Sequence, residues 1–571
     1  MRQKIIRLTI LSLFALVAMD LIYLQVVRGK YFYSLSTNNR IRVVPTDAQR
    51  GRILDRNGIP MAENRLSFDV AVIPQDIQDK NKLFDFLSGI LGIEKNKLLR
   101  QFWQRKVTPF APVVIAGDVD KKTAMVLEEN RFRFPGLYIQ EDFRRYYPFG
   151  EVAAHVLGYV GKINRVKMEK LEEYGYTPLS VIGYSGVEEY YDQYLVGKEG
   201  GQQIEVNSRG RQVRLLGSRQ PQKGQDIQLT IDMQIQQITD EVLKGHHGAI
   251  IVMDLDTGEI LAMSSSPAYD PNIFSNRRLS YKIGELQTDP ASPLLNRAIK
   301  GQYPPGSVFK VVDSVAGLMT GKITPEMEIH SPGYYQLGRR RFHGTAPPGM
   351  YNMGKAIERS CNVYFYNVGL LVGPEALSNY ARMFGLGQLT DIDLPFEEKG
   401  FVPGPEARRR QGRQWYKGDT LNFSIGQGEL LTTPIQITRM MATVALNGRE
   451  VQPHLIKRIG DQKIVGDLAV RQLPIPPEVF KEVKEGLRRV VHGTIGTARN
   501  LDMPGLEISG KTGTAQSVSN KNNHAWFAGF ETTSRPRMAF CVFLEYGGSS
   551  HHSAAMAREM FEEMKKTEII Q

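Results

Sequence analysis

Three short polar motifs lie in order along this chain, each set into apolar sequence, and only a fold that brings distant segments to one cleft can unite them. They are Ser307-Val308-Phe309-Lys310, Ser360-Cys361-Asn362 and Lys511-Thr512-Gly513. The first combines a hydroxyl nucleophile with a lysine, the second offers a hydroxyl and an amide, and the third places a lysine on an expected strand. Each motif can supply a different part of one acyl-transfer site.

The first motif predicts a serine that opens a buried helix. The run 303–306 contains two prolines and a glycine, which stop any preceding element, and apolar residues then recur at helical spacing. Lys310 lies one turn after Ser307, on the same face. A buried lysine beside another positive charge has a lowered pKa, so Lys310 can take the proton of Ser307, with Lys511 as that charge. The alternative, an N-cap serine followed by a solvated lysine, fits poorly with the apolar neighbours of Lys310.

The second motif separates two apolar helical segments, at 353–358 and 363–366. This pattern predicts a short turn that faces a cleft. Asn362 can then bind both Lys310 and a substrate amide, and Ser360 can pass a proton toward a leaving group. Similar polar triplets occur on ordinary protein surfaces, so the second motif indicates a catalytic site only in combination with the first and third motifs.

The third motif follows an alternating segment at 506–509 that predicts a strand. Gly510 and Gly513 carry no side chain, and we expect them to leave room for an extended ligand that pairs with this strand edge. Lys511 and the hydroxyls of Thr512 and Thr514 can hold a carboxylate. A phosphate-binding loop is the alternative, but the spacing G-x-x-x-x-G-K-[ST] is absent.

In this order the motifs resemble S-x-x-K, S-x-N and K-[ST]-G, the signature of the penicillin-interacting serine acyltransferases. The segments 50–58, 147–158 and 183–188 are similar to the N-terminal module of class B penicillin-binding proteins. We expect Arg50, Arg52 and Asp55 to serve domain architecture, with a hairpin turn at 55–58. Gln516, together with the N-terminal motifs, resembles the elongation group, because division-type members more often carry a basic residue there.

This resemblance implies a peptidoglycan D,D-transpeptidase that cross-links stem peptides during cell-wall elongation and is a target of β-lactams. Ser307 would attack the carbonyl of the penultimate D-Ala with Lys310 as base, the terminal D-Ala would leave, and the amine of a neighbouring strand would take the acyl group. The backbone N–H groups of Ser307 and Thr514 would form the oxyanion hole. We expect no cofactor and no metal at this site.

Related proteins with the same motifs remain as alternatives. A division-type septal transpeptidase shares the whole architecture. A serine β-lactamase or a D,D-carboxypeptidase passes the acyl group to water, but a secreted hydrolase needs neither a span nor a large N-terminal module. A β-lactam sensor should carry several spans and an intracellular output domain, whereas this chain shows one apolar run.

That apolar run extends from Ile5 to Val27 and is long enough for one membrane span. A cleaved signal peptide is the alternative, but no small-x-small site follows the run, so we expect an uncleaved anchor. The charge bias across it is small, so the orientation rests on the resemblance, which requires the catalytic domain outside the cytoplasm. Asp20 lies near the outer end of the span, where it can snorkel or meet a partner helix.

Length and patterning predict an α+β protein in three parts. Residues 1–30 form a cytoplasmic stub and transmembrane anchor, 31–235 a mixed, non-catalytic pedestal module, and 236–571 the transpeptidase domain. The last part should contain an antiparallel sheet covered by helices. Its expected strands are a hairpin at 249–263, the Lys511 strand, 526–530 and 538–545, and its expected helices include 234–243 and 554–566.

Charge and cysteine usage constrain the partners. The net charge of +12 comes from dispersed basic residues with no nucleic-acid motif, so we expect no nucleic-acid partner. The runs 339–341 and 408–410, each of three arginines, are predicted to be solvated loops.

The two cysteines, Cys361 and Cys541, are not expected to form a disulfide. A zinc site at Cys361 and His343 is not expected either, because the sequence shows no tight cluster of ligands around them. The resemblance implies a SEDS-family (RodA-type) glycosyltransferase as partner, bound through the anchor and activated by the pedestal module.

Overall fold

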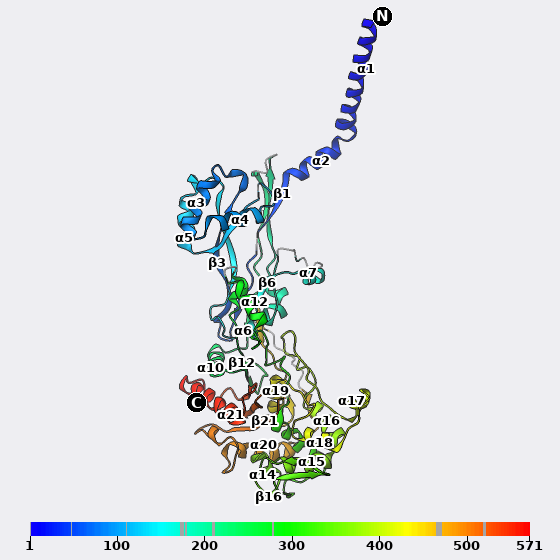
Figure 1. The fold of residues 1–571 in the computed structure, drawn as a ribbon, viewed down its shortest axis with the longest axis vertical. Coiled ribbons are helices and arrows are strands. Elements are labelled where there is room, and N and C mark those ends of the chain that lie inside the picture. Colours follow the sequence, from blue (N-terminus) through cyan, green and yellow to red (C-terminus); the bar gives the residue numbers. More distant parts are fainter. Residues whose placement is uncertain are drawn as a thin grey trace. The chain divides into compact units, whose positions relative to one another are not determined.

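The computed structural model describes residues 2–46, 48–109, 111–171, 176, 180–207, 212–276, 279–463, 471–517 and 521–570. The chain forms two compact units that alternate along the sequence (Figure 1). The first unit comprises 1–51, 64–144 and 196–224, and the second comprises 52–63, 145–195 and 225–571. Two segments from the N-terminal half therefore fold with the catalytic body. The division at about residue 235 stays a prediction.

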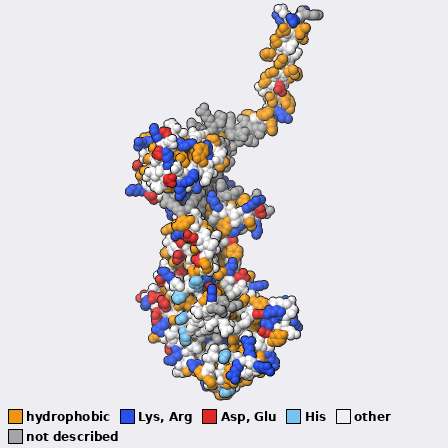
Figure 2. Space-filling model, in the orientation of Figure 1, with side chains coloured by type: hydrophobic (Ala, Val, Ile, Leu, Met, Phe, Trp, Pro, Cys, Tyr) orange, Lys and Arg blue, Asp and Glu red, His pale blue; other side chains and the backbone are white. Residues whose placement is uncertain are grey.

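The N-terminal apolar run is a helix, as expected. Helix α1 (Arg2–Ile22) continues into a π-helical turn, η1 (Tyr23–Val27), and together they are long and apolar enough to cross a membrane. Its apolar side chains are exposed along the whole helix, and Figure 2 shows them covering most of its surface. A lipid environment would bury this surface, so the helix is consistent with a single-pass anchor.

The first unit continues with α2 (Gly29–Arg40) and an antiparallel sheet of β1 (Ile41–Thr46), β8 (Gly200–Val206) and β9 (Gln212–Arg219). A second sheet pairs β3 (Pro60–Val72) with β4 (Val113–Val119) and β5 (Leu137–Tyr146). Helices α3 (Lys80–Leu91), α4 (Lys95–Arg105) and α5 (Lys121–Glu129) contribute to its core, where Phe84 and Phe102 meet edge to face. This core contains none of the three motifs.

The hairpin turn expected at 55–58 is present in the second unit. It follows β2 (Ile53–Leu54), which pairs with the start of β3 and runs parallel to β10 (Ile227–Leu229). The Asp55 carboxylate accepts from the N–H groups of Asn57 and Ile59, and it also accepts from the N–H of Met233, at the start of α10 (Met233–Leu243). Arg52 pairs with Asp226. These contacts support the architectural role expected for Arg52 and Asp55.

The catalytic sheet has five antiparallel strands in the order β12-β11-β23-β22-β21. They are β11 (Gly248–Asp254), β12 (Ile260–Ser266), β21 (Ile508–Ala515), β22 (His524–Glu531) and β23 (Met538–Leu544), which confirms the expected strands. Every residue of the three central strands is buried, so helices cover both faces. Helices α10 (Met233–Leu243) and α21 (Ser550–Lys566) pack together on the sheet, and α19 (Pro434–Ala445) and α20 (Pro477–His492) form a second group. The fold is α+β.

The second unit contains further short helices and strands. The helices are α6 (Ala154–Leu157), α7 (Arg165–Leu171), α8 (Gly186–Tyr190), α9 (Asp192–Leu195), α11 (Asn272–Ser275), α12 (Tyr281–Thr288), α13 (Lys310–Met319), α14 (Met353–Glu358), α15 (Asn362–Val372), α16 (Pro374–Met383), α17 (Pro405–Arg410) and α18 (Lys417–Ser424). The short strands are β6 (Val160–Lys162), β7 (Val181–Gly183), β13 (Ile329–Ser331), β14 (Tyr334–Leu337), β15 (Arg340–His343), β16 (Gly349–Tyr351), β17 (Arg449–Glu450), β18 (Ile456–Ile459), β19 (Gln462–Lys463) and β20 (Arg471–Gln472).

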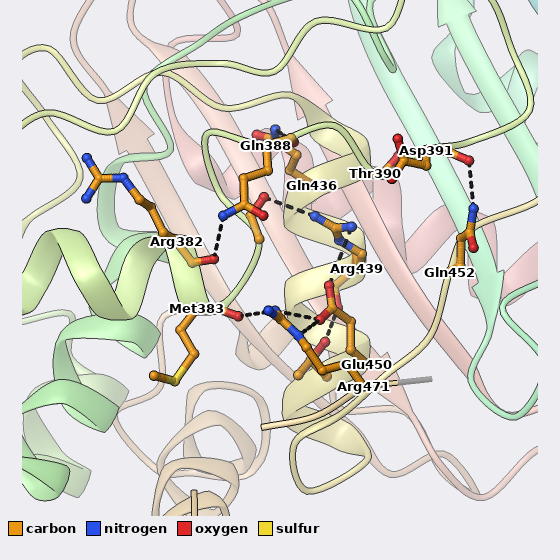
Figure 3. Close-up of polar contacts among 12 residues, drawn as sticks. Arg382, Met383, Gln388, Thr390, Asp391, Gln436, Arg439, Glu450, Gln452 and Arg471 are labelled. Carbon is orange, nitrogen blue, oxygen red and sulfur yellow. Dashed lines mark hydrogen bonds and ion pairs between the residues drawn. The ribbon is translucent and has the colours of Figure 1, made fainter. Parts of the chain in front are cut away.

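Helix α19 packs against strands of the catalytic sheet, and a cluster of polar contacts fixes its position (Figure 3). The buried Arg439 donates to the Gly385 carbonyl at 3.0 Å and pairs with Glu450 at 3.5 Å. Glu450 also pairs with Arg471, which donates to the carbonyl of Met383 at the end of α16. Because Arg439 lies in the middle of α19, this network fixes the helix to the end of α16.

One of the two arginine runs differs from expectation. Residues 339–341 are exposed, on the hairpin of β14 and β15, whereas Arg408 lies on α17 with its side chain only 11% exposed. Its guanidinium pairs with Asp419 at 2.5 Å and with Glu429 at 3.3 Å. The expectation of a solvated loop is therefore wrong for Arg408, because carboxylates later in the sequence fold back onto it.

Removing the buried carboxylate of Glu188 should destabilise the second unit. The side chains of Glu188 and Arg145 are 0% and 2% exposed and form an ion pair at 2.5 Å, and Tyr147 also donates to Glu188. Glu188→Ala leaves the Arg145 charge buried without this partner, which typically costs about 3–5 kcal/mol. We expect the thermal unfolding midpoint to fall by several degrees.

The matched control is Glu169→Ala, which breaks an exposed ion pair with Arg165 and should change the midpoint little. Equal midpoints for the two variants would show that the buried pair contributes no more than the exposed one.

Candidate active site

Ser307 lies on a short 3-10 turn, η5 (Gly306–Phe309), that leads directly into α13. The expected α-helix therefore begins at Lys310 rather than at Ser307. Gly306 adopts φ +55°, and its N–H donates to the carbonyl of Gly426 at 2.9 Å. Val308 and Phe309 are buried while Ser307 is partly exposed, so the turn presents the hydroxyl and anchors its neighbours in the core.

The first and second motifs meet at Lys310. Its side chain is 0% exposed, and Nζ donates to Asn362 Oδ1 at 2.6 Å, to the Ser360 carbonyl at 2.8 Å and to Ser360 Oγ at 3.2 Å. Three acceptors match the three N–H donors of an ammonium group. A neutral amine donates only two bonds and can accept the third from the Ser360 hydroxyl. The geometry therefore suits either protonation state without moving a heavy atom.

Electrostatics favour the neutral amine. Burial, followed by the charge of Lys511, lowers the pKa of Lys310 well below its ordinary value, against smaller opposing effects of Cys361 and Asp313. Burial also lowers the pKa of Lys511, to about 7. Two buried lysines that repel each other cannot both stay charged at low cost. Lys310 can therefore be neutral and accept a proton from a neighbouring hydroxyl.

A carboxyl group that sequence reasoning missed lies one turn after Lys310. Asp313 is fully buried in α13, and within the described part of the chain neither carboxyl oxygen has a hydrogen-bond partner. Burial raises the pKa of Asp313 well above its usual range. A neutral acid at this position leaves Lys310 without a strong counter-charge, which agrees with a neutral lysine. In the sequence, Asp313 is one polar residue among many.

The turn predicted between two helical segments is present. Helix α14 ends at Glu358, Ser360 adopts φ +58°, and Cys361 precedes the first residue of α15, Asn362. Thr345, which the sequence gave no reason to single out, donates its hydroxyl to the Ser360 carbonyl and accepts from the N–H of Asn362. Thr345 therefore fixes the backbone of Ser360 and Asn362, the two residues that the sequence predicts for the site.

The third motif lies on β21, the edge strand of the catalytic sheet, as expected. The reason expected for its glycines is wrong. A Cβ at Gly513 would lie 2.9 Å from the Pro305 carbonyl and 2.9 Å from Val308, and one at Gly510 would meet the ring of Phe527 at 2.8 Å. The protein's own chain fills this space, so the glycines allow internal packing rather than ligand access.

The packing of β21 against η5 brings the third motif to the first. Alternation along the strand places Lys511 on the same face as Gly513, which contacts η5, and the fully buried Lys511 donates to the Thr512 carbonyl at 3.2 Å. Thr512 and Thr514 lie on the other face, where Thr514 is exposed. A Cβ at Gly306 would come within 2.7 Å of the Thr514 carbonyl, so the backbones next to Ser307 and at Thr514 are adjacent.

Two polar side chains outside the motifs complete this region. Gln427 donates its amide N–H to the Thr514 carbonyl at 3.3 Å, and the Thr497 hydroxyl lies 2.7 Å from that of Thr512. Among the residues that the structure describes, no group of three or more histidine, cysteine or acidic side chains could hold a metal ion. Cys361 and Cys541 are free, buried thiols.

Comparison with protein families matches both halves of the chain. Residues 248–564 match the penicillin binding protein transpeptidase domain, and residues 45–229 match the penicillin-binding protein dimerisation domain. The chain is 33% identical to the peptidoglycan D,D-transpeptidase MrdA of Acinetobacter baumannii, over 95% of this chain and 84% of that protein. It is 32% identical to MrdA of Escherichia coli K12, over 98% of this chain and 93% of that protein.

Solved structures show the same fold. The penicillin-binding protein PBP2 of Helicobacter pylori, solved in complex with MreC, is 28% identical, with a TM-score of 0.80 over 92% of this chain and 99% of that one. PBP2 of Pseudomonas aeruginosa, in complex with WCK 5153, is 30% identical, with a TM-score of 0.69 over 91% of this chain and 96% of that one. A chain from a peptidoglycan synthase complex that couples polymerization and crosslinking is 30% identical, with a TM-score of 0.76 over 98% of both chains.

Proposed function

Since this chain belongs to the penicillin-binding protein transpeptidases and is a peptidoglycan D,D-transpeptidase of the elongation type, we propose that its three motifs form the catalytic site. The proposed site consists of Ser307, Lys310, Ser360, Asn362, Lys511, Thr512, Gly513 and Thr514. One observation carries the proposal: the buried Lys310 amine bonds to both polar side chains of the second motif, while its pKa is lowered.

Acylation begins when Ser307 Oγ attacks the carbonyl carbon of the penultimate D-Ala and its proton passes to Lys310. The backbone N–H groups of Ser307 and Thr514 stabilise the oxyanion, a contribution that typically reaches a hundredfold or more in rate. The C–N bond to the terminal D-Ala then breaks, and Ser360 relays the proton from Lys310 to the leaving amine. The acceptor amine of a second stem peptide next attacks the acyl-enzyme and gives up its proton to Lys310. The ester bond to Ser307 then breaks, and Lys310 returns the proton to Ser307 Oγ.

Donor recognition uses the edge strand and the second motif. An extended peptide can align along β21, with its terminal carboxylate held by the Thr512 and Thr514 hydroxyls and by the charge of Lys511. Asn362 binds the donor's amide through the group that it does not offer to Lys310. A β-lactam carries the same carboxylate and a reactive carbonyl, so it acylates the same serine.

The first test replaces the nucleophile. Ser307→Ala should abolish covalent labelling by a fluorescent penicillin, a loss of about a thousandfold or more, because no other hydroxyl occupies this position. Thermal unfolding should be little affected, since Ser307 is partly exposed on its turn. The measurement is labelling followed by mass spectrometry of the acylated peptide.

Lys310→Arg is the matched variant, because it keeps a cation but cannot supply a neutral base. It should also lose acylation. Label found on another residue would refute the assignment of Ser307, and near-normal acylation of the arginine variant would show that Lys310 is only structural.

The proposed location of the enzyme is the membrane surface. The helix Arg2–Val27 is consistent with one span, and we propose that the rest of the chain lies outside the cytoplasm at the cell (inner) membrane, where stem peptides are cross-linked. The glycan strands must come from a polymerase, and the proposed partner is a SEDS-family (RodA-type) glycosyltransferase that binds the anchor helix. The similarity to a chain of a peptidoglycan synthase complex supports this partner.

Exchange of the anchor tests the partner. A chain whose residues 2–27 are replaced by an unrelated span should react with penicillin at the normal rate but no longer co-purify with the polymerase or stimulate it. A truncated chain that begins near residue 226 would be a less informative test, because it would also lose 52–63 and 145–195, which belong to the catalytic unit. Full stimulation by the exchanged chain would contradict binding through the anchor.

A further inference from the structure

Residues 493–498, the first part of the connection between α20 and β21, form a loop that contacts the second and third motifs. Its Ile495 N–H donates to the Glu358 carboxylate at 3.2 Å, and Arg359 donates to the Ile495 carbonyl at 3.4 Å. Glu358 and Arg359 immediately precede Ser360 in the sequence. At its other end, the loop places the Thr497 hydroxyl 2.7 Å from the hydroxyl of Thr512. The loop therefore contacts two of the three elements of the proposed site.

Close packing fixes the loop. A Cβ at Gly493 would overlap the Glu358 carboxylate, and one at Gly496 would overlap the Val490 carbonyl. Ala498 is fully buried, and its N–H donates to the same carbonyl at 2.9 Å. Thr497 lies between these fixed points, so its position relative to Thr512 is set by the fold.

The two threonine hydroxyls form a directional pair. A separation of 2.7 Å is the preferred length for an O–H···O bond, and either oxygen can donate. A carboxylate only accepts hydrogen bonds, so a bound carboxylate needs the Thr512 proton. That proton is free only if Thr497 donates to Thr512. A chain of two hydroxyls aligned toward an anion also strengthens both bonds.

We propose that Thr497 is a positioning residue that donates to Thr512 and so directs the Thr512 proton at the carboxylate of the acyl donor. This inference rests on the proposed function of Thr512. It assigns Thr497 no part in the chemistry at Ser307, so its effect depends on the ligand. A donor with a terminal carboxylate requires Thr497, whereas a donor in which that group is a neutral amide does not.

The test compares two probes on the full chain: a penicillin, and the same penicillin with its ring carboxylate converted to the primary amide. Thr497→Val removes the hydroxyl and keeps a branched side chain of similar size. We expect the rate constant for acylation of Ser307 by the penicillin to fall roughly tenfold, as for a lost hydrogen bond to a charged group, while that for the amide changes less than about twofold. Thr497→Ser restores the hydroxyl and should restore the selectivity.

Thr494→Val is the matched control, because Thr494 is an exposed threonine of the same loop. An equal loss with both probes in Thr497→Val and Thr497→Ala would overturn the proposal by assigning Thr497 a general structural role. An unchanged rate with the penicillin would overturn it as well. If neither probe acylated Ser307 of the wild-type chain, the proposed function itself would fail, an outcome distinct from failure of the Thr497 proposal alone.

Discussion

Burial of the Lys310 amine is the constraint on which the rest of the site depends. An isolated ammonium group is costly to bury, and a second buried lysine, Lys511, adds repulsion, so Lys310 is stable mainly as a neutral amine with satisfied hydrogen bonds. Ser360 and Asn362 supply those bonds. The turn between α14 and α15, and Thr345 that fixes it, are arranged to bring them to one point.

The second structural requirement is close contact between the Ser307 turn and the edge of the catalytic sheet. Gly306 and Gly513 permit it, because a side chain at either position would meet the opposing backbone. This contact places the Ser307 and Thr514 backbones side by side, and Lys511 lies close enough to Lys310 for its charge to lower the Lys310 pKa. The catalytic geometry is thus a consequence of tight packing between η5 and β21, with the central strands buried on both faces beneath it.

Local patterns predicted the motifs, the catalytic strands and the anchor helix, because apolar spacing and alternation depend on neighbours in the sequence. Other features depend on distant residues. The sequence predicts a solvated Arg408, whereas in the structure Arg408 pairs with Asp419 and Glu429, which lie later in the chain. Asp313, Thr345 and Thr497 carry no local signal, since their significance comes only from what they contact. Residues 52–63 and 145–195 likewise belong to the catalytic unit because of their tertiary contacts. No change in amino-acid composition along the chain marks these boundaries.

The most direct test of this account is the pH dependence of acylation by penicillin in the wild-type chain. A neutral Lys310 is required as base, so the acylation rate constant should fall as pH drops through the pKa of Lys310 in the free enzyme. Because burial and Lys511 lower that pKa, the account predicts that this acid limb lies well below the ordinary lysine value of 10.5, with substantial acylation near neutral pH. An acid limb near 10.5 would mean that Lys310 is an ordinary charged lysine in the resting enzyme, and it would contradict the central claim.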